Sequence, residues 1–134
     1  GEGVNLASRL EGLNKVLGTD CVISRETKAG IGDRLVTRLI GGFQLKGFDK
    51  PVEVYDLVGW PEEEEKTRPW REAFASALAD YHGRKLEAAQ AGFRRTLELR
   101  AGDGPSAFYL AKLEELRGQT LPEDWATYTI MREK

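Results

Sequence analysis

The feature that most constrains this chain is an acidic stretch that separates two different sequence patterns. Four glutamates, Glu62–Glu65, lie between Pro61 and Pro69. Proline removes a backbone donor and a block of like charges repels itself, so we expect a solvated linker at residues 60–69. A docking site for a basic partner is the alternative. The pattern is mixed helix and strand before the linker, over residues 1–59, and helical after it, over residues 70–134.

Residues 1–59 show the periodicities of both helix and strand. An amphipathic helix ending at Gly18 is predicted by apolar residues at helical spacing, which are Val4, Ala7, Leu10, Leu13 and Leu17. We then expect a buried strand at 21–23, a short helix capped by Ser24, a strand at 35–40, and a hairpin of 43–46 with 52–58. The expected elements are therefore a mixture of helices and strands.

Residues 70–134 predict helices only. Three apolar stripes have helical spacing: Phe74, Ala77, Leu78 and Tyr81; Leu86, Ala89, Phe93 and Leu97; and Phe108, Leu110, Leu113 and Leu116. The pattern of Tyr81, Ala89 and Phe93 is similar to a tetratricopeptide repeat, so we expect an all-α, tetratricopeptide-like helical hairpin tail. One repeat cannot bury its apolar face alone, and we favour packing on the first part over a peptide-binding groove.

The charge balance argues against several partners. Lysine and arginine number 20 against 22 aspartates and glutamates, a net charge of −2, which favours neither nucleic acid nor an anionic membrane. No apolar run approaches the roughly 20 residues that cross a bilayer. The single cysteine, Cys21, fits a reducing compartment. We expect a cytoplasmic location for this portion and leave open a membrane tether in a longer parent protein.

The main candidate for chemistry is the beginning of the first predicted helix. Asn5 and Arg9 are four residues apart, about 40° around the helix axis, so both side chains project from one face. The amino end of a helix also carries partial positive charge and free amides, which suit an anion. An arginine fork beside a neutral amide is a suitable pair for a phosphate and a sugar oxygen. Taken alone, the pair is also what an ordinary solvated helix face presents.

Two segments resemble class III adenylate and guanylate cyclases. Residues 4–9, Val-Asn-Leu-Ala-Ser-Arg, resemble the Val-Asn-x-Ala-x-Arg signature, and residues 12–15 continue as in bacterial members. Residues 45–47, Leu-Lys-Gly, and residues 51–55, Pro-Val-Glu-Val-Tyr, resemble the closing hairpin of the same catalytic domain. The resemblance covers about residues 1–57 and implies the α+β class, as part of a ferredoxin-like cyclase domain.

The resemblance implies a reaction and a role for three residues. A nucleoside triphosphate, ATP in preference to GTP, would become a 3′,5′-cyclic nucleotide and pyrophosphate for intracellular signalling. By the resemblance, Asn5 holds the ribose, Arg9 stabilises charge on the α-phosphate in the transition state, and Lys46 contacts the β- and γ-phosphates. The alternative for Lys46 is an ordinary exposed strand lysine.

The same resemblance places the metal site outside this chain. The family uses two Mg²⁺ or Mn²⁺ ions, held by two aspartates that lie upstream of Gly1 in the family's layout. It works as a homodimer with its sites between subunits. We therefore expect the missing N-terminal half of the domain as a partner, and little activity from the fragment alone. A catalytically silent pseudo-cyclase and a helical-repeat interaction module are the alternatives.

Overall fold

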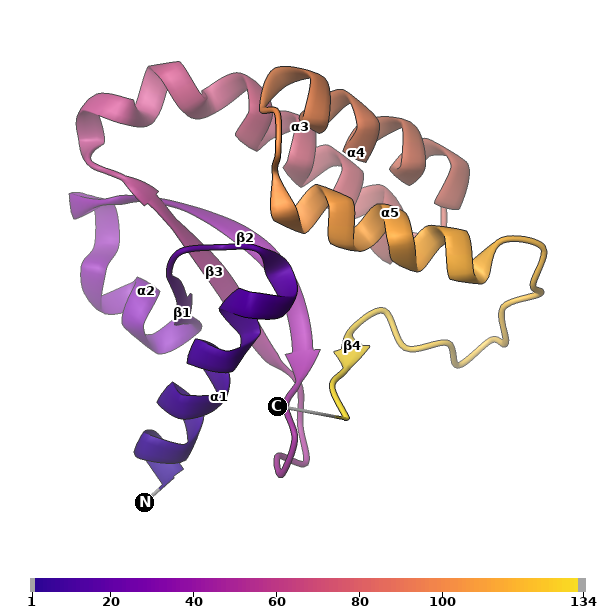
Figure 1. The fold of residues 1–134 in the computed structure, drawn as a ribbon, viewed down its shortest axis with the longest axis horizontal. Coiled ribbons are helices and arrows are strands. Elements are labelled where there is room, and N and C mark those ends of the chain that lie inside the picture. Colours follow the sequence, from indigo (N-terminus) through magenta and orange to yellow (C-terminus); the bar gives the residue numbers. More distant parts are fainter. Residues whose placement is uncertain (1, 133–134) are drawn as a thin grey trace. The chain divides into compact units, whose positions relative to one another are not determined.

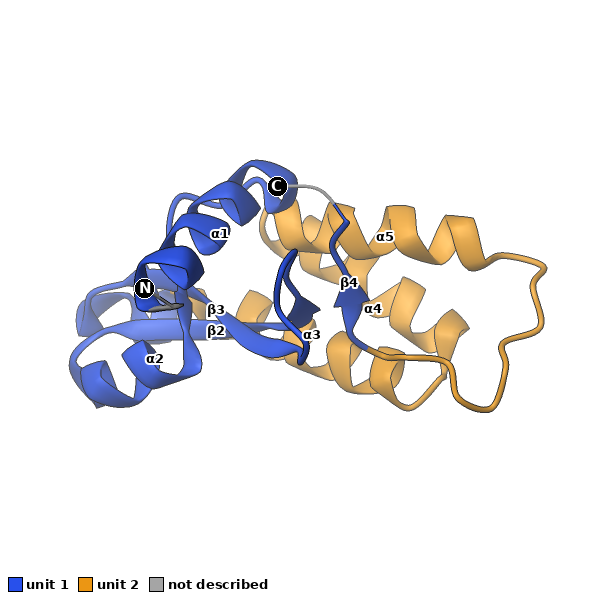
Figure 2. Cartoon of the chain, turned by 90° about the horizontal axis from the view of Figure 1, so that it is seen from below, with its two compact units in different colours: residues 1–66, 128–134 blue, residues 67–127 orange. Residues whose placement is uncertain are grey.

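The computed structural model describes residues 2–132, which form two compact units (Figure 2). Unit 1 comprises Gly1–Lys66 and Tyr128–Lys134, and unit 2 comprises Thr67–Thr127. Unit 1 contains a four-stranded sheet with helices, whereas unit 2 is helical. The predicted α+β class is confirmed. Within residues 2–132, no helix combines the length and the apolar character that crossing a membrane requires.

The sheet of unit 1 has the strand order β1-β3-β2-β4 (Figure 1). Its strands are β1 (Val22–Ser24), β2 (Val36–Gln44), β3 (Val52–Gly59) and β4 (Thr129–Ile130). Strands β1 and β2 pair antiparallel with β3, and β4 pairs parallel with β2. The predicted hairpin is present, but β2 is one strand where we expected two. A register shift between Leu39 and Gly41 marks a bulge in it.

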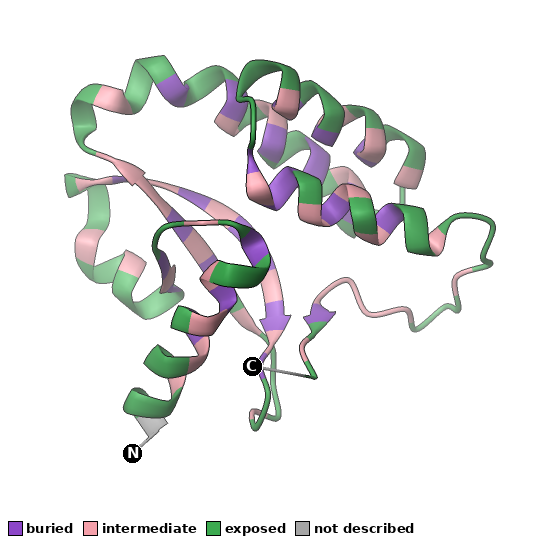
Figure 3. Cartoon of the chain, viewed as in Figure 1, coloured by how far each residue is buried: buried purple, intermediate pink, exposed green. Residues whose placement is uncertain are grey.

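One face of this sheet forms the core of unit 1. Side chains along a strand alternate between the two faces, and Figure 3 shows the resulting stripes of buried residues. The fully buried residues on the strands are Ile40, Phe43 and Val54. Helix α1 (Glu2–Leu17) adds Leu10, Leu13 and Leu17 to the buried residues of this unit. The apolar face of α1 and the buried face of the sheet therefore account for the core.

Three residues that we predicted to be buried are exposed. The Val4 side chain is 72% exposed, and Ala7 is also exposed. Val4 lies about 120° around the α1 axis from Leu10, outside the arc that the buried leucines occupy. Cys21 precedes β1 and is exposed, although its carbonyl accepts a hydrogen bond from the Leu57 amide at 3.0 Å.

Helix α2 (Arg25–Ile31) lies on the opposite face of the sheet. It begins as predicted, with the Ser24 hydroxyl accepting a hydrogen bond from the Thr27 amide at 3.1 Å. The Lys28 ammonium lies 5.5 Å from the centroid of the Tyr55 ring, and Tyr55 points away from the buried face. A short 3₁₀ turn at residues 32–34 leads from α2 to β2.

The end of the chain returns to unit 1, which corrects the prediction of a helical tail through residue 134. Thr129 and Ile130 pair with Phe43 and Gln44 of β2. A strand of two residues has no periodicity, and its partner lies more than 80 residues away in sequence. Local patterns therefore gave no sign of β4.

A glycine in β2 makes room for this return. A Cβ atom added to Gly42 would lie 3.3 Å from the Cβ atom of Tyr128, tighter than an ordinary contact. The absence of a side chain at position 42 thus lets residue 128 approach the sheet just before β4 begins.

The predicted linker is largely helical, which corrects the expectation for residues 60–69. A 3₁₀ turn at Pro61–Glu63 is followed by α3 (Glu64–His82), which runs through Pro69. Acidic residues are favourable in the first turn of a helix, where the helix dipole is positive, so the glutamates begin α3. Pro69 removes one backbone hydrogen bond, but the next residue, Trp70, is buried in unit 2 and holds the helix in place.

Unit 2 packs α3 against α4 (Leu86–Leu99) and α5 (Gly104–Leu116) around aromatic side chains. The ring centroids of Phe93 lie 5.4 Å from Phe74 and 5.0 Å from Tyr109. The Tyr81 and Tyr109 rings meet edge to face at 5.0 Å. These rings bury one another within unit 2, so the helices supply each other's apolar partner.

Close helix packing and one unusual turn complete unit 2. A Cβ atom added to Gly92 of α4 would lie 2.7 Å from the Cβ atom of Ala77 of α3, so glycine is required where these helices meet. Arg84, between α3 and α4, adopts a φ of 65°. Its guanidinium donates to the carbonyls of Leu121 and Glu123 and lies over the Trp125 ring.

The third apolar stripe was predicted only in part. In α5 the buried residues are Pro105, Ser106, Tyr109 and Leu113. The helix begins one residue after Asp103, whose carboxylate accepts a hydrogen bond from the Ser106 amide. This start turns Tyr109 inward, whereas we expected Phe108, Leu110 and Leu116 to be buried.

Candidate functional site

Asn5 and Arg9 lie one turn apart in the first half of α1. Asn5 is exposed and Arg9 is half-buried. At 3.6 residues per turn, Arg9 lies about 70° and Asn5 about 110° from the centre of the stripe formed by Leu10, Leu13 and Leu17. The core therefore holds α1 by one face, and the two polar residues occupy its flank.

The side chains of this pair are available for a ligand. Within the part of the chain that the structure describes, neither the Asn5 nor the Arg9 side chain takes part in a hydrogen bond or an ion pair. Gly12 and Val16 follow on the same flank of α1 at helical spacing, and Val16 is 42% exposed. A guanidinium with up to five donors and an amide with both donor and acceptor thus share one accessible surface.

Lys46 lies in the turn that connects β2 and β3, not on a strand as we expected. The turn is closed by a hydrogen bond from the Phe48 amide to the Leu45 carbonyl at 3.0 Å. The Gln44 side-chain amide donates to the carbonyls of Phe48 at 3.1 Å and Asp49 at 3.3 Å. Lys46 itself is exposed, so its ammonium is accessible at the tip of the hairpin.

The three predicted site residues thus occupy two places in unit 1. Asn5 and Arg9 share the flank of α1, and Lys46 lies on the β2–β3 turn. Among the described residues, no hydrogen bond connects Lys46 with α1. The chain presents a pair of groups that can bind a polar or anionic ligand, and a separate exposed cation.

The acidic residues that the structure describes do not form a site for the two metal ions. Across residues 2–132, no group of three or more aspartate, glutamate, histidine or cysteine side chains is arranged to hold a metal. Asp56 is buried and forms an ion pair with Arg38 at 2.5 Å. Magnesium needs several oxygen ligands in near-octahedral geometry, and these side chains do not fit it.

The ion pair of Arg38 and Asp56 was not predicted. The two residues lie directly opposite each other on β2 and β3, with side chains 2% and 8% exposed. A buried pair of this kind stabilises one register of the strands, because any slip would leave a charge unpaired in the core. Its sequence signal was a charged residue at an inward position of each strand.

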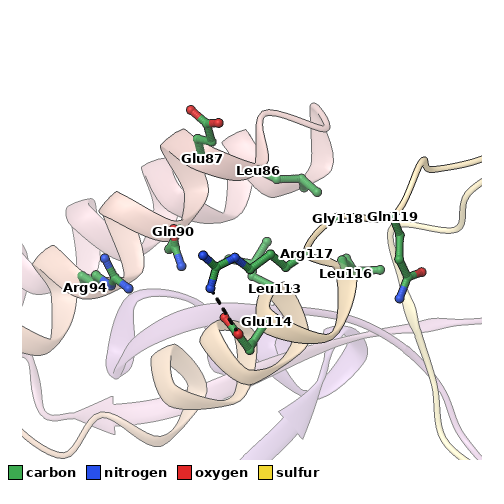
Figure 4. A pocket seen from close by; sticks show the side chains of 10 residues that line it. All are labelled: Leu86, Glu87, Gln90, Arg94, Leu113, Glu114, Leu116, Arg117, Gly118 and Gln119. Carbon is green, nitrogen blue, oxygen red and sulfur yellow. Dashed lines mark hydrogen bonds and ion pairs between the residues drawn. The ribbon is translucent and has the colours of Figure 1, made fainter.

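Unit 2 has a groove between α4 and the end of α5 (Figure 4). Its volume is about 620 Å³. Leu86 and Leu113 provide apolar surface, and Gln90 and Arg94 of α4 face Arg117, which pairs with Glu114. It contains none of the predicted site residues.

Two curated proteins are similar to parts of the chain. The adenylate cyclase of Dictyostelium discoideum described as terminal-differentiation specific is 28% identical over 120 residues, which cover 84% of this chain and 6% of that protein. Adenylate cyclase 1 of Rhizobium meliloti (strain 1021) is 39% identical over 59 residues, which cover 44% of this chain and 9% of that protein.

The chain therefore spans less than a tenth of the length of either relative. No family model matches the chain, and no solved structure matches it. Both matched proteins are adenylate cyclases, and these partial similarities point to a relationship between this chain and the cyclases.

Proposed function

We propose that this chain is the C-terminal part of a class III nucleotide cyclase catalytic domain, joined to a tetratricopeptide-like helical unit. The parent protein would convert a nucleoside triphosphate to a 3′,5′-cyclic nucleotide and pyrophosphate for intracellular signalling. The names of the two relatives favour ATP over GTP. The observation that supports this most is the accessible pair Asn5 and Arg9, one turn apart on the flank of α1.

In the proposed reaction, the ribose 3′-oxygen attacks the α-phosphorus in line. The new oxygen–phosphorus bond closes the ring, the bond from the α-phosphorus to the bridging oxygen breaks, and pyrophosphate leaves while the 3′-hydroxyl loses its proton. Asn5 would orient the ribose. Arg9 would donate hydrogen bonds to the α-phosphate oxygens, where negative charge grows. Lys46 would attract the β- and γ-phosphates.

The proposal includes partners that this chain does not provide. Two Mg²⁺ or Mn²⁺ ions would neutralise the leaving group, and their ligands would come from another part of the polypeptide, because the described acidic residues do not fit them. A homodimer would place Asn5 and Arg9 of one subunit beside the metal-binding residues of its partner. The location would be cytoplasmic for this portion.

The test uses the full natural polypeptide that contains this chain. With ATP and Mg²⁺ or Mn²⁺ we expect it to form cyclic AMP, and Arg9→Ala to lower kcat by roughly 10²- to 10³-fold, the usual loss for a transition-state donor. Lys15→Ala removes an exposed cation elsewhere on α1 and should leave kcat within about twofold. Full activity in Arg9→Ala would remove this residue from the mechanism.

The alternatives make a different prediction in the same experiment. A pseudo-cyclase, or a helical-repeat interaction module, would yield no cyclic nucleotide from either ATP or GTP. The groove between α4 and α5 is the feature that favours an interaction role for unit 2. An inactive but folded dimer of the full polypeptide would therefore favour these alternatives over the cyclase.

A further inference from the structure

The side chain of Gln44 helps to close the turn that carries Lys46. Gln44, the last residue of β2, donates from its amide to the carbonyls of Phe48 and Asp49 at 3.1 and 3.3 Å. These two bonds span the turn in which Lys46 lies. Without them, one backbone hydrogen bond, from Phe48 to Leu45, would close the turn within the described residues.

Strand β4 holds Gln44 from the other side. The Met131 amide donates to the Gln44 carbonyl at 2.9 Å, and Ile130 is the register partner of Gln44. The backbone of Gln44 is thus bound to the end of the chain, while its side chain closes the turn. Gly42, two residues earlier, makes room for Tyr128 as the chain approaches the sheet.

We propose that β4 and Gln44 are positioning elements that fix the β2–β3 turn so that Lys46 is presented to the triphosphate. This inference rests on the proposed function, because it gives Lys46 a substrate. A lysine on a mobile turn loses conformational freedom when it binds a phosphate, and a turn that is already ordered reduces this loss. The segment that follows the helical unit would therefore contribute to substrate affinity without touching substrate.

Two variants remove the two supports separately in the full natural polypeptide. Gln44→Ala removes the side chain that closes the turn. Met131→Pro removes the amide that binds Gln44, and proline is tolerated at the edge of a sheet in extended backbone.

Each variant has a matched control. In a parallel ladder, the register partnership of Gln44 and Ile130 turns the Ile130 amide away from β2, so Ile130→Pro keeps the bonds to Gln44. Gln119→Ala removes a glutamine whose amide donates to a backbone carbonyl, that of Glu115, in unit 2. Both controls should behave like the unmodified protein.

Two measurements follow the turn and the substrate. We expect Gln44→Ala and Met131→Pro to speed hydrogen exchange at the Phe48 amide by about tenfold, because opening of the turn becomes easier. We expect both to raise KM for the metal complex of ATP by about tenfold, with kcat within about twofold, because the one or two lost hydrogen bonds act through a binding residue.

A double variant separates positioning from general destabilisation. If Gln44 acts through Lys46, then Gln44→Ala added to Lys46→Ala should raise KM by less than about twofold beyond Lys46→Ala alone. A general loss of structure would lower kcat and add to the effect of Lys46→Ala. That additive result would overturn the inference.

The inference and the proposed function fail in distinguishable ways. A normal KM in Lys46→Ala would reject the substrate role of Lys46, and with it this inference. A raised KM in Lys46→Ala, together with normal exchange and normal KM in Gln44→Ala and Met131→Pro, would reject the inference alone. Raised values in those two variants and normal values in both controls would support it.

Discussion

The two units of this chain build their cores in different ways. In unit 2 the core consists of aromatic rings from helices that follow one another in sequence, such as Phe74, Phe93 and Tyr109. In unit 1 it depends on strand pairings, one of which joins residue 43 to residue 129. It also contains a buried ion pair, Arg38 with Asp56.

This difference predicts which unit a substitution will affect. The candidate site residues Asn5, Arg9 and Lys46 belong to unit 1, whose core depends more on contacts between residues that are far apart in the sequence. As long as unit 2 stays folded, a defect in its aromatic core should be confined to it, whereas a defect in the strand pairing should reach the candidate site. Each of the following predictions tests one side of this comparison.

The largest effect is expected in unit 2. Phe93→Ala removes a fully buried ring that touches two others, and should lower the free energy of unfolding of unit 2 by about 4 kcal/mol. Urea unfolding followed by tryptophan fluorescence measures this, because Trp70 and Trp125 lie in unit 2 and the third tryptophan, Trp60 of unit 1, is already 68% exposed.

The control for this variant is Leu99→Ala, at a side chain that is 38% exposed, which should change stability by less than about 0.5 kcal/mol. Hydrogen exchange in β2 and β3 should stay unchanged in Phe93→Ala. Equal loss of protection in both units would break the comparison, since the two cores would then unfold together.

A smaller effect, confined to unit 1, is expected from the ion pair. Asp56→Ala leaves the Arg38 guanidinium buried beside a lost partner and should destabilise unit 1 by about 3 kcal/mol. The double change Arg38→Met with Asp56→Leu should recover most of this loss, because a buried pair can be replaced by packed apolar side chains. Hydrogen exchange of the β2 and β3 amides provides the measurement.

The exposed pair of Arg25 and Glu53, at 3.8 Å, is the matched control in the same unit. Arg25→Ala should change stability by less than about 0.5 kcal/mol, because solvent screens such a pair. A loss as large as that of Asp56→Ala would mean that burial does not explain the difference between the two pairs.

The smallest effect is a pH dependence of unit 2. Burial raises the pKa of Tyr81 from its ordinary value of 10.0 to about 12, and the charge of Glu115 adds to this. The unfolded chain would lose this proton near pH 10, whereas the folded unit would keep it to about pH 12. The stability that Tyr81 contributes is therefore complete below pH 10 and falls as the pH rises to 12.

Urea unfolding at pH 9, 10 and 11 would measure this fall. Tyr81→Phe should show a shallower decline over the same range, because phenylalanine has no proton to lose. Identical pH profiles for the two proteins would show that Tyr81 is not protected from ionisation by burial.

Local periodicity predicted much of this fold. The stripe of Leu10, Leu13 and Leu17 in α1, the β2–β3 hairpin, and the inward rings of α3 and α4 all follow from spacing along one element. The boundary between the two units falls within residues 60–69, but the helix there was not predicted. Prolines and like charges were taken as breakers, whereas acidic residues suit the first turn of a helix. The pairing of β4 depends on a distant strand, and nothing near residue 129 in sequence indicates it.

The placement of the candidate site residues was likewise predicted in part. Spacing alone places Asn5 and Arg9 on one face of a helix, and their position on the flank of the buried stripe follows from the same geometry. Lys46 lies in a turn because β2 ends at Gln44, two residues before the end that we predicted for the strand. The role of Gln44 depends on the path of the turn, which a sequence pattern does not specify.

Because the short strand β4 pairs with β2, unit 2 is an insertion that is connected at both ends to unit 1. When unit 2 is folded, its compact path keeps β4 near β2 at a high effective concentration. When unit 2 unfolds, β4 can stay in place only by closing a flexible loop of about sixty residues, which has an entropic cost. Unfolding of the helices would therefore weaken the pairing of β4 with β2 and loosen the β2–β3 turn.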